Sequence, residues 1–271
     1  ESLNDEKIRA YESLGVNRIS LGVQSFKDEL LQVCNRRHSV SQAVSVIEKI
    51  KKSAISTFSI DLIFGLPNQT MEDVKHDISM FLSLDIPHLS IYSLQIEENS
   101  VFGKKGIKPI DSDLEADMFE YITKTLEEAG YIHYEISSFC KPDHHSRHNL
   151  AYWQDQDFYG IGCGASGRIN GIRYDNTTSL KEYCLNGPQA TYIHETLAER
   201  GMDAIMMALR TKFGLNIKEW NLKYQNDFKE HYSTVLDKYH EYFCFEGECI
   251  YLNDAGLEIL NTILVDFMMI E

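Results

Sequence analysis

The sequence lacks any long apolar run, because no window approaches the ~20 apolar residues that a membrane helix needs. Its first residues, ESLNDEKIRA, lack the charged-then-apolar order of a signal peptide. Basic residues are also scarce: 26 Lys and Arg face 41 Asp and Glu, for a net charge of −15. This balance disfavours general binding to the phosphate backbone of nucleic acid. We therefore predict a cytoplasmic protein with no nucleic-acid partner and no stable membrane insertion.

Paired cysteines are absent as well. The six cysteines show neither a CxxC motif nor a disulfide-like spacing and lie at positions 34, 140, 163, 184, 244 and 249. This dispersal is typical of reduced thiols in a cytosolic protein. The simplest interpretation is that these residues are small buried hydrophobes.

Strands and helices alternate along the first half of the chain. Apolar alternation predicts strands at residues 18–25, 57–65, 88–96 and 131–139. Capping residues and helical spacing predict helices at residues 4–14, from 28 to 50 with a break near NRRHS, from Thr70 onward, and at 113–129. Such alternation indicates parallel β/α units. Right-handed crossovers would then place the carboxyl ends of all strands on one face.

The character of the sequence changes after the fourth predicted strand. The segment from DHHSRHNLAYW to GIGCGASGRINGIRY is aromatic and rich in glycine, and it shows no helical period. This composition indicates loop and short strand, where sites tend to lie. Beyond Asn176 the pattern is mostly helical, with a short strand at ECIYL and a final amphipathic helix. We expect a domain at residues 1–175 and a mostly helical, winged-helix-like domain at residues 176–271.

Polar side chains interrupt or end the predicted strands. Gln24 ends the first strand, Asp61 lies in the second, and Gln95 with Glu97 closes the third. In a β/α barrel, polar residues at the carboxyl ends of strands are the main site candidates. Asp61 lies in the apolar run SIDLIFG, where an unpaired carboxylate would be costly. It needs hydrogen-bond donors, which either ligand hydroxyls or a neighbouring loop could supply.

Arg36 belongs to the doublet Arg36-Arg37 that follows the first strand and its helix. Its guanidinium could bind a ligand carboxylate in the bidentate geometry that arginine favours. The alternative is a solvated surface residue.

A histidine cluster, HHSRH, contains His144, His145 and His148. A zinc site is disfavoured, because the cysteine and carboxylate partners of such sites are not at a recognisable spacing. An imidazole can also bind haem iron, and Tyr152 and Trp153 could supply a flat aromatic wall beside His148. A solvent-exposed polar loop is the remaining alternative.

Spaced glycines follow this cluster in the stretch GIGCGASG, residues 160–167. No clear strand-turn-helix context surrounds them, so a dinucleotide-binding motif is disfavoured. Close approach of a flat ligand and tight packing on the barrel explain the glycines equally well.

Several stretches together resemble the radical S-adenosylmethionine (SAM) proteins of the oxygen-independent coproporphyrinogen III oxidase group. In chain order they are NRISLGVQSF from Asn17, the pair Asn35-Arg36, and IDLIFGLPNQT from Ile60. The similarity runs through almost the whole chain.

Later stretches resemble one branch of that group. HNLAYW from His148 and YGIGCGA from Tyr159 are similar to the HNxxYW and GxGxGA region of the haem-chaperone branch, HemW, rather than to that of the true oxidase, HemN. The tail, with ALRT from Ala208 and FGL from Phe213, looks like the C-terminal domain of the group.

The resemblance implies an α/β fold: the C-terminal part of a partial (β/α)6 radical SAM barrel, followed by a mostly helical, winged-helix-like domain. It also implies that some of the candidate residues contact SAM. Arg36 suits the methionyl carboxylate, and Asp61 suits polar groups of the nucleoside or amino acid. The residues that match SAM-contacting positions, or fall near them, are Gln24, Arg36, Asp61, Gln95 and Ser166.

Two further implications concern metals. His148 matches the motif histidine that is linked to haem in the chaperone branch. The family's CxxxCxxC, which supplies three thiolates to a 4Fe-4S cluster, is absent, and no cysteine of this chain can replace it at that spacing. We therefore expect a chain truncated at its N-terminus, with Glu1 near an unpaired strand edge. Alone, it should neither hold the cluster nor cleave SAM.

The resulting hypothesis is a HemW-like protein that binds haem for delivery to haem-accepting proteins and, when intact, receives electrons from a donor. Oxygen-independent coproporphyrinogen III oxidase is the enzymatic alternative, and a cofactor-free interaction module is the non-enzymatic one. The sequence leaves the oligomeric state open.

Overall fold

The computed structural model describes residues 3–55 and 57–270. By internal contacts the chain divides into two compact units, Glu1–His145 and Ser146–Glu271. The division therefore falls after His145, whereas the sequence led us to expect a boundary after residue 175. The segment with the histidine motif and the spaced glycines belongs to the second unit.

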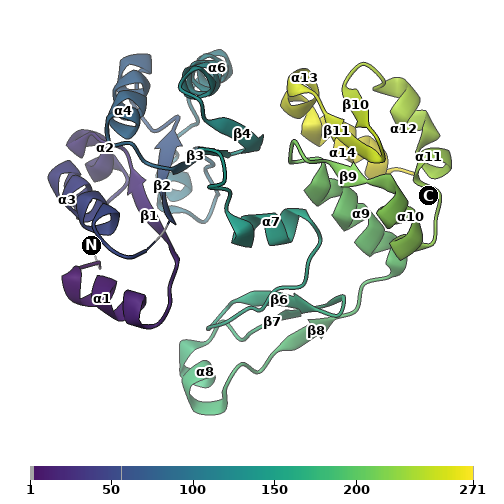
Figure 1. The fold of residues 1–271 in the computed structure, drawn as a ribbon, viewed down its shortest axis with the longest axis horizontal. Helices are drawn as coiled ribbons and strands as arrows, with labels where there is room; N and C mark the ends of the chain where they lie inside the picture. Colours follow the sequence, from purple (N-terminus) through teal and green to yellow (C-terminus); the bar gives the residue numbers. More distant parts are fainter. Residues whose placement is uncertain (1–2, 56, 271) are drawn as a thin grey trace. The chain divides into compact units, whose positions relative to one another are not determined.

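The first unit is built on one five-stranded sheet with the order β1-β2-β3-β5-β4. Figure 1 labels β1 to β4 of this sheet. The strands are β1 (Arg18–Gln24), β2 (Thr57–Phe64), β3 (His88–Ser93), β4 (Ile132–Glu135) and β5 (Ser138–Cys140). The helices are α1 (Asp5–Ser13), α2 (Asp28–Val33), α3 (Val40–Lys51), α4 (Met71–Ser83), α5 (Val101–Lys104) and α6 (Ser112–Glu128). Strands β1, β2 and β3 are parallel, which confirms the β/α units predicted from the alternation.

The helix starts follow from local chemistry. The Asn4 side chain accepts a hydrogen bond from the Lys7 backbone N–H at 2.9 Å and caps α1. Thr70 and Asp73 form a reciprocal capping box at the start of α4. Both caps were predicted from the sequence and are confirmed.

The prediction of a single strand over residues 131–139 is wrong. The segment folds into a hairpin in which β4 and β5 pair antiparallel, and β5 inserts between β3 and β4. The Glu135 carboxylate accepts a hydrogen bond from the Ser137 backbone N–H at 3.2 Å and supports the turn. Because so short a connection forces antiparallel pairing, the last part of the sheet is mixed rather than parallel.

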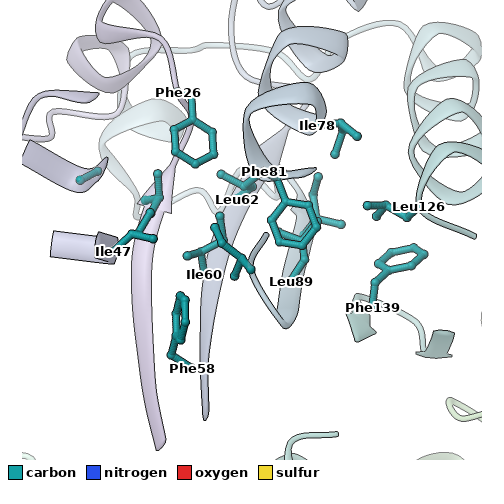
Figure 2. Close-up of a cluster of buried hydrophobic side chains, with 14 of the residues drawn as sticks. Phe26, Ile47, Phe58, Ile60, Leu62, Ile78, Phe81, Leu89, Leu126 and Phe139 are labelled. Atoms are coloured by element: carbon teal, nitrogen blue, oxygen red, sulfur yellow. The ribbon is translucent and has the colours of Figure 1, made fainter. Parts of the chain in front are cut away.

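The sheet has one apolar and one polar face, because successive strand residues point to opposite sides. Figure 2 shows the apolar face, where Phe58, Ile60 and Leu62 of β2 meet Ile78 and Phe81 of α4. Side chains of α3 and α6 belong to the same core. The opposite face carries a row of small or polar residues in register across four strands, namely Gly22, Asp61, Ser90 and Ser138.

The sheet is open within the described residues, with β1 and β4 at its two edges. This arrangement agrees with part of a barrel rather than a closed one. The expectation for Glu1 concerns a residue outside the described part of the chain. Every helix in residues 3–55 and 57–270 is too short or too polar to cross a membrane.

A buried carboxylate of α4 fixes the turn after β1. The Asp77 carboxylate accepts hydrogen bonds from the Ser25 hydroxyl at 2.8 Å and from the Phe26 backbone N–H at 2.7 Å. Burial raises the pKa of Asp77 to about 6, although these hydrogen bonds act in the opposite direction. The end of β1 is therefore tied directly to α4.

The second unit contains two small antiparallel sheets with the orders β6-β7-β8 and β10-β11-β9. The strands are β6 (Ser166–Ile169), β7 (Ile172–Asp175), β8 (Thr191–Ile193), β9 (Leu215–Asn216), β10 (Phe243–Glu246) and β11 (Cys249–Leu252). The helices are α7 (Arg147–Trp153), α8 (Leu180–Asn186), α9 (Leu197–Ala208), α10 (Ile217–Tyr224), α11 (Phe228–His231), α12 (Ser233–Lys238), α13 (Asp254–Glu258) and α14 (Leu260–Met268).

The core of the second unit lies in its C-terminal part. The Trp220 ring packs edge-on against Phe228 with centroids 5.4 Å apart, and Tyr232 packs against Phe267 at 5.0 Å. The Trp220 indole N–H donates to the Gly201 carbonyl at 2.9 Å, which satisfies its polar atom inside this core. The expectation of helices followed by a small hairpin and a last helix is confirmed here.

Asp77 generates a prediction about pH. Its folded-state pKa of about 6 lies above the ordinary 3.8, so the folded protein holds this proton more tightly than the unfolded chain. The contribution of Asp77 to stability is therefore greatest at low pH and is lost as the pH rises through about 6. We expect the free energy of unfolding of the wild type, relative to Asp77→Asn, to fall by about 2–3 kcal/mol from about pH 4 to about pH 7. Urea unfolding of both proteins measures this difference, and a value independent of pH would contradict the assignment.

Candidate functional site

Gln24 ends β1 in the left-handed conformation, with a φ of 73°, which is uncommon for a residue with a side chain. Gly22 pairs with Asp61 and Gln24 pairs with Leu62, so one extra residue forms a β-bulge between them. A Cβ at Gly22 would lie 2.5 Å from Gln24 Nε2. The absence of a side chain at Gly22 therefore makes room for the buried Gln24 amide on the polar face of the sheet.

Asp61 lies on the same face, beside Gly22 on β1 and Ser90 on β3. The Ser20 hydroxyl lies 3.1 Å from both carboxylate oxygens of Asp61 and donates to them. Burial raises the pKa of Asp61, while the Ser20 hydrogen bond and the charge of Arg18 act in the opposite direction. Within the described residues, the donor to Asp61 is thus the Ser20 hydroxyl of β1 and not a group of a neighbouring loop, and the two carboxylate oxygens keep further acceptor capacity.

The polar face becomes more enclosed toward the amino ends of the strands. Arg18 approaches Thr57 Oγ1 at 3.4 Å, and burial lowers its pKa. The His88 Nε2 and Tyr134 hydroxyl lie 2.8 Å apart, and burial lowers the pKa of His88 to about 3. A buried, neutral histidine and a half-buried arginine therefore lie at this end of the face.

Arg36 and Gln95 lie in exposed segments after the strands. His38 Nε2 lies 3.3 Å from the Val23 carbonyl oxygen, which ties the Arg36 loop to the end of β1. The Leu94 backbone N–H donates to the Phe64 carbonyl at 2.9 Å, so Gln95 follows beside the end of β2. Gln24 thus ends β1, Arg36 and Gln95 lie in the segments after β1 and β3, and Asp61 lies within β2 on the polar face.

Ser166 belongs to the second unit and opens β6. Its hydroxyl donates to Asp175 Oδ1 at 2.5 Å across the β6-β7 pair. Ser166 therefore lies in the second unit, whereas the other four candidate residues lie in the first.

His148 lies on α7, whose start is capped by the Ser146 side chain. Its imidazole is exposed, and Nε2 lies 2.9 Å from the Tyr152 hydroxyl, one turn along the same helix. The Tyr152 ring packs edge-on against Phe158 at 4.4 Å. Three rings thus run from α7 to the start of the glycine-rich loop.

Residues 159–165 form a loop that internal contacts hold in place. The Asn176 side-chain amide donates to the Gly160 carbonyl at 3.0 Å and to the Gly162 carbonyl at 2.9 Å. The Tyr174 hydroxyl accepts from the Gly160 backbone N–H at 2.9 Å, and a Cβ at Gly167 would lie 2.3 Å from the Tyr174 ring. The loop leads into β6 and not into a helix, which rules out a dinucleotide-binding turn. Tight internal packing explains Gly160 and Gly167.

The other histidines of the cluster have structural contacts in the first unit. His144 Nδ1 lies 3.4 Å from Thr57 Oγ1, and the His145 ring packs edge-on against Tyr134 at 4.8 Å. In the described part of the chain, no three histidine, cysteine or acidic residues come together as metal ligands would. The six free cysteines are likewise scattered over both units, so they do not fit a 4Fe-4S cluster.

Sequence reasoning missed several residues that shape these sites. Ser20 and Gly22 precede Gln24 at two-residue spacing, and this alternation could have placed them beside Asp61. Asp77 and Asn176 gave no such signal, because their hydrogen-bond partners lie in other segments of the chain. Asp77 accepts from Ser25 and Phe26, and Asn176 donates to the loop at Gly160 and Gly162. Tyr174 is evident only once the β6-β7 pairing is known.

Comparison with known proteins identifies the family. The family model of the radical SAM superfamily matches residues 1–81, and that of the HemN C-terminal domain matches residues 196–259. The structure is similar to that of coproporphyrinogen III oxidase (HemN) from Escherichia coli, with a TM-score of 0.83 at 18% identity over 99% of this chain and 68% of that one. At this identity the match shows the fold alone, and it confirms the radical SAM fold with a helical C-terminal domain.

Two curated relatives extend over nearly the whole chain. The heme chaperone HemW of Lactococcus lactis subsp. lactis (strain IL1403) is 36% identical over 276 residues, which cover 98% of this chain and 73% of that protein. The heme chaperone HemW of Bacillus subtilis (strain 168) is 32% identical over 281 residues, which cover 99% of this chain and 74% of that protein. The chain therefore belongs to the HemW family of radical SAM proteins.

Proposed function

We propose that the protein binds haem as cargo and delivers it to haem-accepting proteins. The observation that carries this proposal is the exposed imidazole of His148 on α7, within the HNLAYW stretch. The names of the two HemW relatives, both heme chaperones, support it. We place this activity in the cytoplasm, on the basis of the dispersed cysteines.

The surroundings of His148 suit an axial ligand. A histidine that binds a metal through one ring nitrogen usually donates a hydrogen bond from the other. Here Nε2 is engaged with the Tyr152 hydroxyl, and Nδ1 has no hydrogen-bond partner among the described residues. When Nε2 carries the proton and the Tyr152 hydroxyl accepts the hydrogen bond from it, Nδ1 carries the lone pair and is available to iron. Tyr152 would then orient the ring and increase the basicity of the ligand nitrogen.

We further propose that SAM contacts implied by the family lie at Gln24, Arg36, Asp61 and Gln95 of the first unit. Gln24, Arg36 and Gln95 lie at or after the carboxyl ends of strands β1 and β3, where ligands of β/α folds bind, and Asp61 lies on the polar face of β2. Asp61 is half-buried and keeps acceptor capacity beyond the single Ser20 hydroxyl. The exposed Arg36 offers a guanidinium for a carboxylate.

The radical chemistry of the superfamily needs a 4Fe-4S cluster, which supplies an electron to SAM. The residues of this chain do not fit that cluster, because its cysteines are neither in a CxxxCxxC motif nor gathered in space. The role that we assign to these 271 residues is therefore to bind SAM and haem, and not to cleave SAM. An electron donor would act only on a protein that also holds the cluster.

The first test is titration of the chain with hemin. We expect the wild type to shift the Soret band and His148→Ala to lose that shift, because the axial ligand is removed. His194→Ala is the matched control, since His194 is also an exposed histidine of the second unit and should bind as the wild type does. A Soret shift that persists unchanged in His148→Ala would contradict the ligand assignment, and no shift in the wild type would favour a cofactor-free module.

A second test addresses Tyr152. Removing a hydrogen-bond partner of a ligating histidine typically weakens metal binding about 10–100-fold. We therefore expect Tyr152→Phe to retain the Soret shift but to bind hemin about tenfold more weakly. Equal affinity in both proteins would show that the Tyr152 hydroxyl does not support the ligand.

A third test separates the carrier from the enzymatic alternative. Protein in which the cluster motif is present should transfer haem to an apo-acceptor and should not convert coproporphyrinogen to protoporphyrinogen. Anaerobic assay with SAM and a reductant measures the conversion. Robust turnover would overturn the carrier proposal in favour of the oxidase.

A further inference from the structure

The stretch from residue 141 to residue 203 does not bury its hydrophobic side chains. The structure describes every residue of this stretch, and none of its hydrophobic side chains is among the buried ones. Several are strongly exposed: Tyr159 at 73%, Ile161 at 87%, Leu180 at 67%, Leu185 at 71% and Tyr192 at 65%. Apolar side chains that are exposed together commonly mark a binding surface, whereas single exposed ones are normal.

Tyr159 and Ile161 differ from the other exposed residues because they lie on a loop with a fixed backbone. Both carbonyls that flank Ile161, those of Gly160 and Gly162, accept hydrogen bonds from Asn176. The Cys163 thiol donates to the Thr177 carbonyl at 3.2 Å, so it is turned toward the protein. The loop therefore holds two apolar side chains in solvent on a rigid support, which lowers the entropy lost on binding.

The shape of this loop suits a flat ligand. In residues 159–165 every second residue is a glycine, at positions 160, 162 and 164, and so carries no side chain. A Cβ at Gly162 would meet no atom within 4 Å, which shows open space beside the backbone. Only two large apolar side chains project from this strip, so a planar ligand can approach it closely.

The loop is continuous with the proposed haem ligand. His148 contacts Tyr152, Tyr152 packs against Phe158, and Phe158 directly precedes Tyr159. Phe158 is further fixed by its backbone bridge to Arg168. Arg147, beside His148, is exposed and forms no ion pair with another described residue, so it is available to a ligand carboxylate.

We propose that Tyr159 and Ile161 form a platform that contacts the apolar face of the haem macrocycle, while His148 binds the iron. The inference rests on the proposed function. The loop favours a planar macrocycle over a protein partner, because two side chains on a glycine-rich strip offer much less than the area of a stable protein interface. The exposed Arg147 complements the haem propionates.

Metal-free protoporphyrin IX tests the platform separately from the iron ligand, because it presents the same macrocycle without iron. We expect Tyr159→Ser and Ile161→Ser each to bind protoporphyrin IX about tenfold more weakly than the full wild-type chain, as measured by porphyrin fluorescence. Leu185→Ser is the matched control, since Leu185 is exposed on α8, outside the loop, and this variant should bind normally. His148→Ala should bind protoporphyrin IX as the wild type does and lose only the hemin Soret shift.

The outcomes distinguish the two proposals. If Tyr159→Ser and Ile161→Ser bind both porphyrins normally while His148→Ala loses the hemin shift, the platform is wrong and the haem function stands. If the wild type binds neither porphyrin, the proposed function fails. If the wild type sediments as an oligomer and the loop variants as monomers with unchanged porphyrin affinity, the platform contacts a second copy of the chain and the inference is overturned. Unchanged circular dichroism and melting temperature show that the exposed-site variants are folded.

Discussion

The alternation of successive side chains between the two faces of β1, β2 and β3 is the constraint on which the first unit depends. It sends one set of side chains into the core against α3, α4 and α6, and it sends the other set, including Asp61 and Ser90, to the opposite face. A single extra residue in β1 breaks this alternation and brings Gln24 over Gly22. The strained conformation of Gln24 is sustained by the Asp77 contacts at the next two residues, so the core helix also shapes the site.

Different contacts stabilise the second unit. Its C-terminal part has an aromatic core around Trp220, whereas residues 146–203 are held by hydrogen bonds, glycine packing and the ring contacts of Tyr152. The arrangement leaves apolar side chains and the His148 imidazole in water. These residues gain little from apolar burial, and a ligand that covers the exposed side chains and binds only the folded state would stabilise the fold.

The elements with a strong local pattern were predictable from the sequence. The parallel strands, the caps at Asn4 and Thr70, and the helical C-terminal part all followed from periodicity and capping chemistry. The β4-β5 hairpin was missed because YIHYEISSF carries no glycine or asparagine at its turn. The proposed roles of Gln24, Arg36 and His148 came from the family resemblance, since a polar residue in a single sequence does not show by itself that it binds a ligand. The contacts of Asp77 and Asn176 join segments that only the fold brings together.

The central claim is that haem binds to the second unit, at α7 and the glycine-rich loop, and not to the polar face of the first sheet. Backbone amide NMR of the full chain with gallium protoporphyrin IX, a diamagnetic haem analogue, tests the location most directly. The account predicts that the shifted signals concentrate at residues 147–162, while Ser20, Asp61 and Ser90 stay unchanged. Shifts confined to the β1, β2 and β3 residues, with none on α7 or the loop, would contradict it.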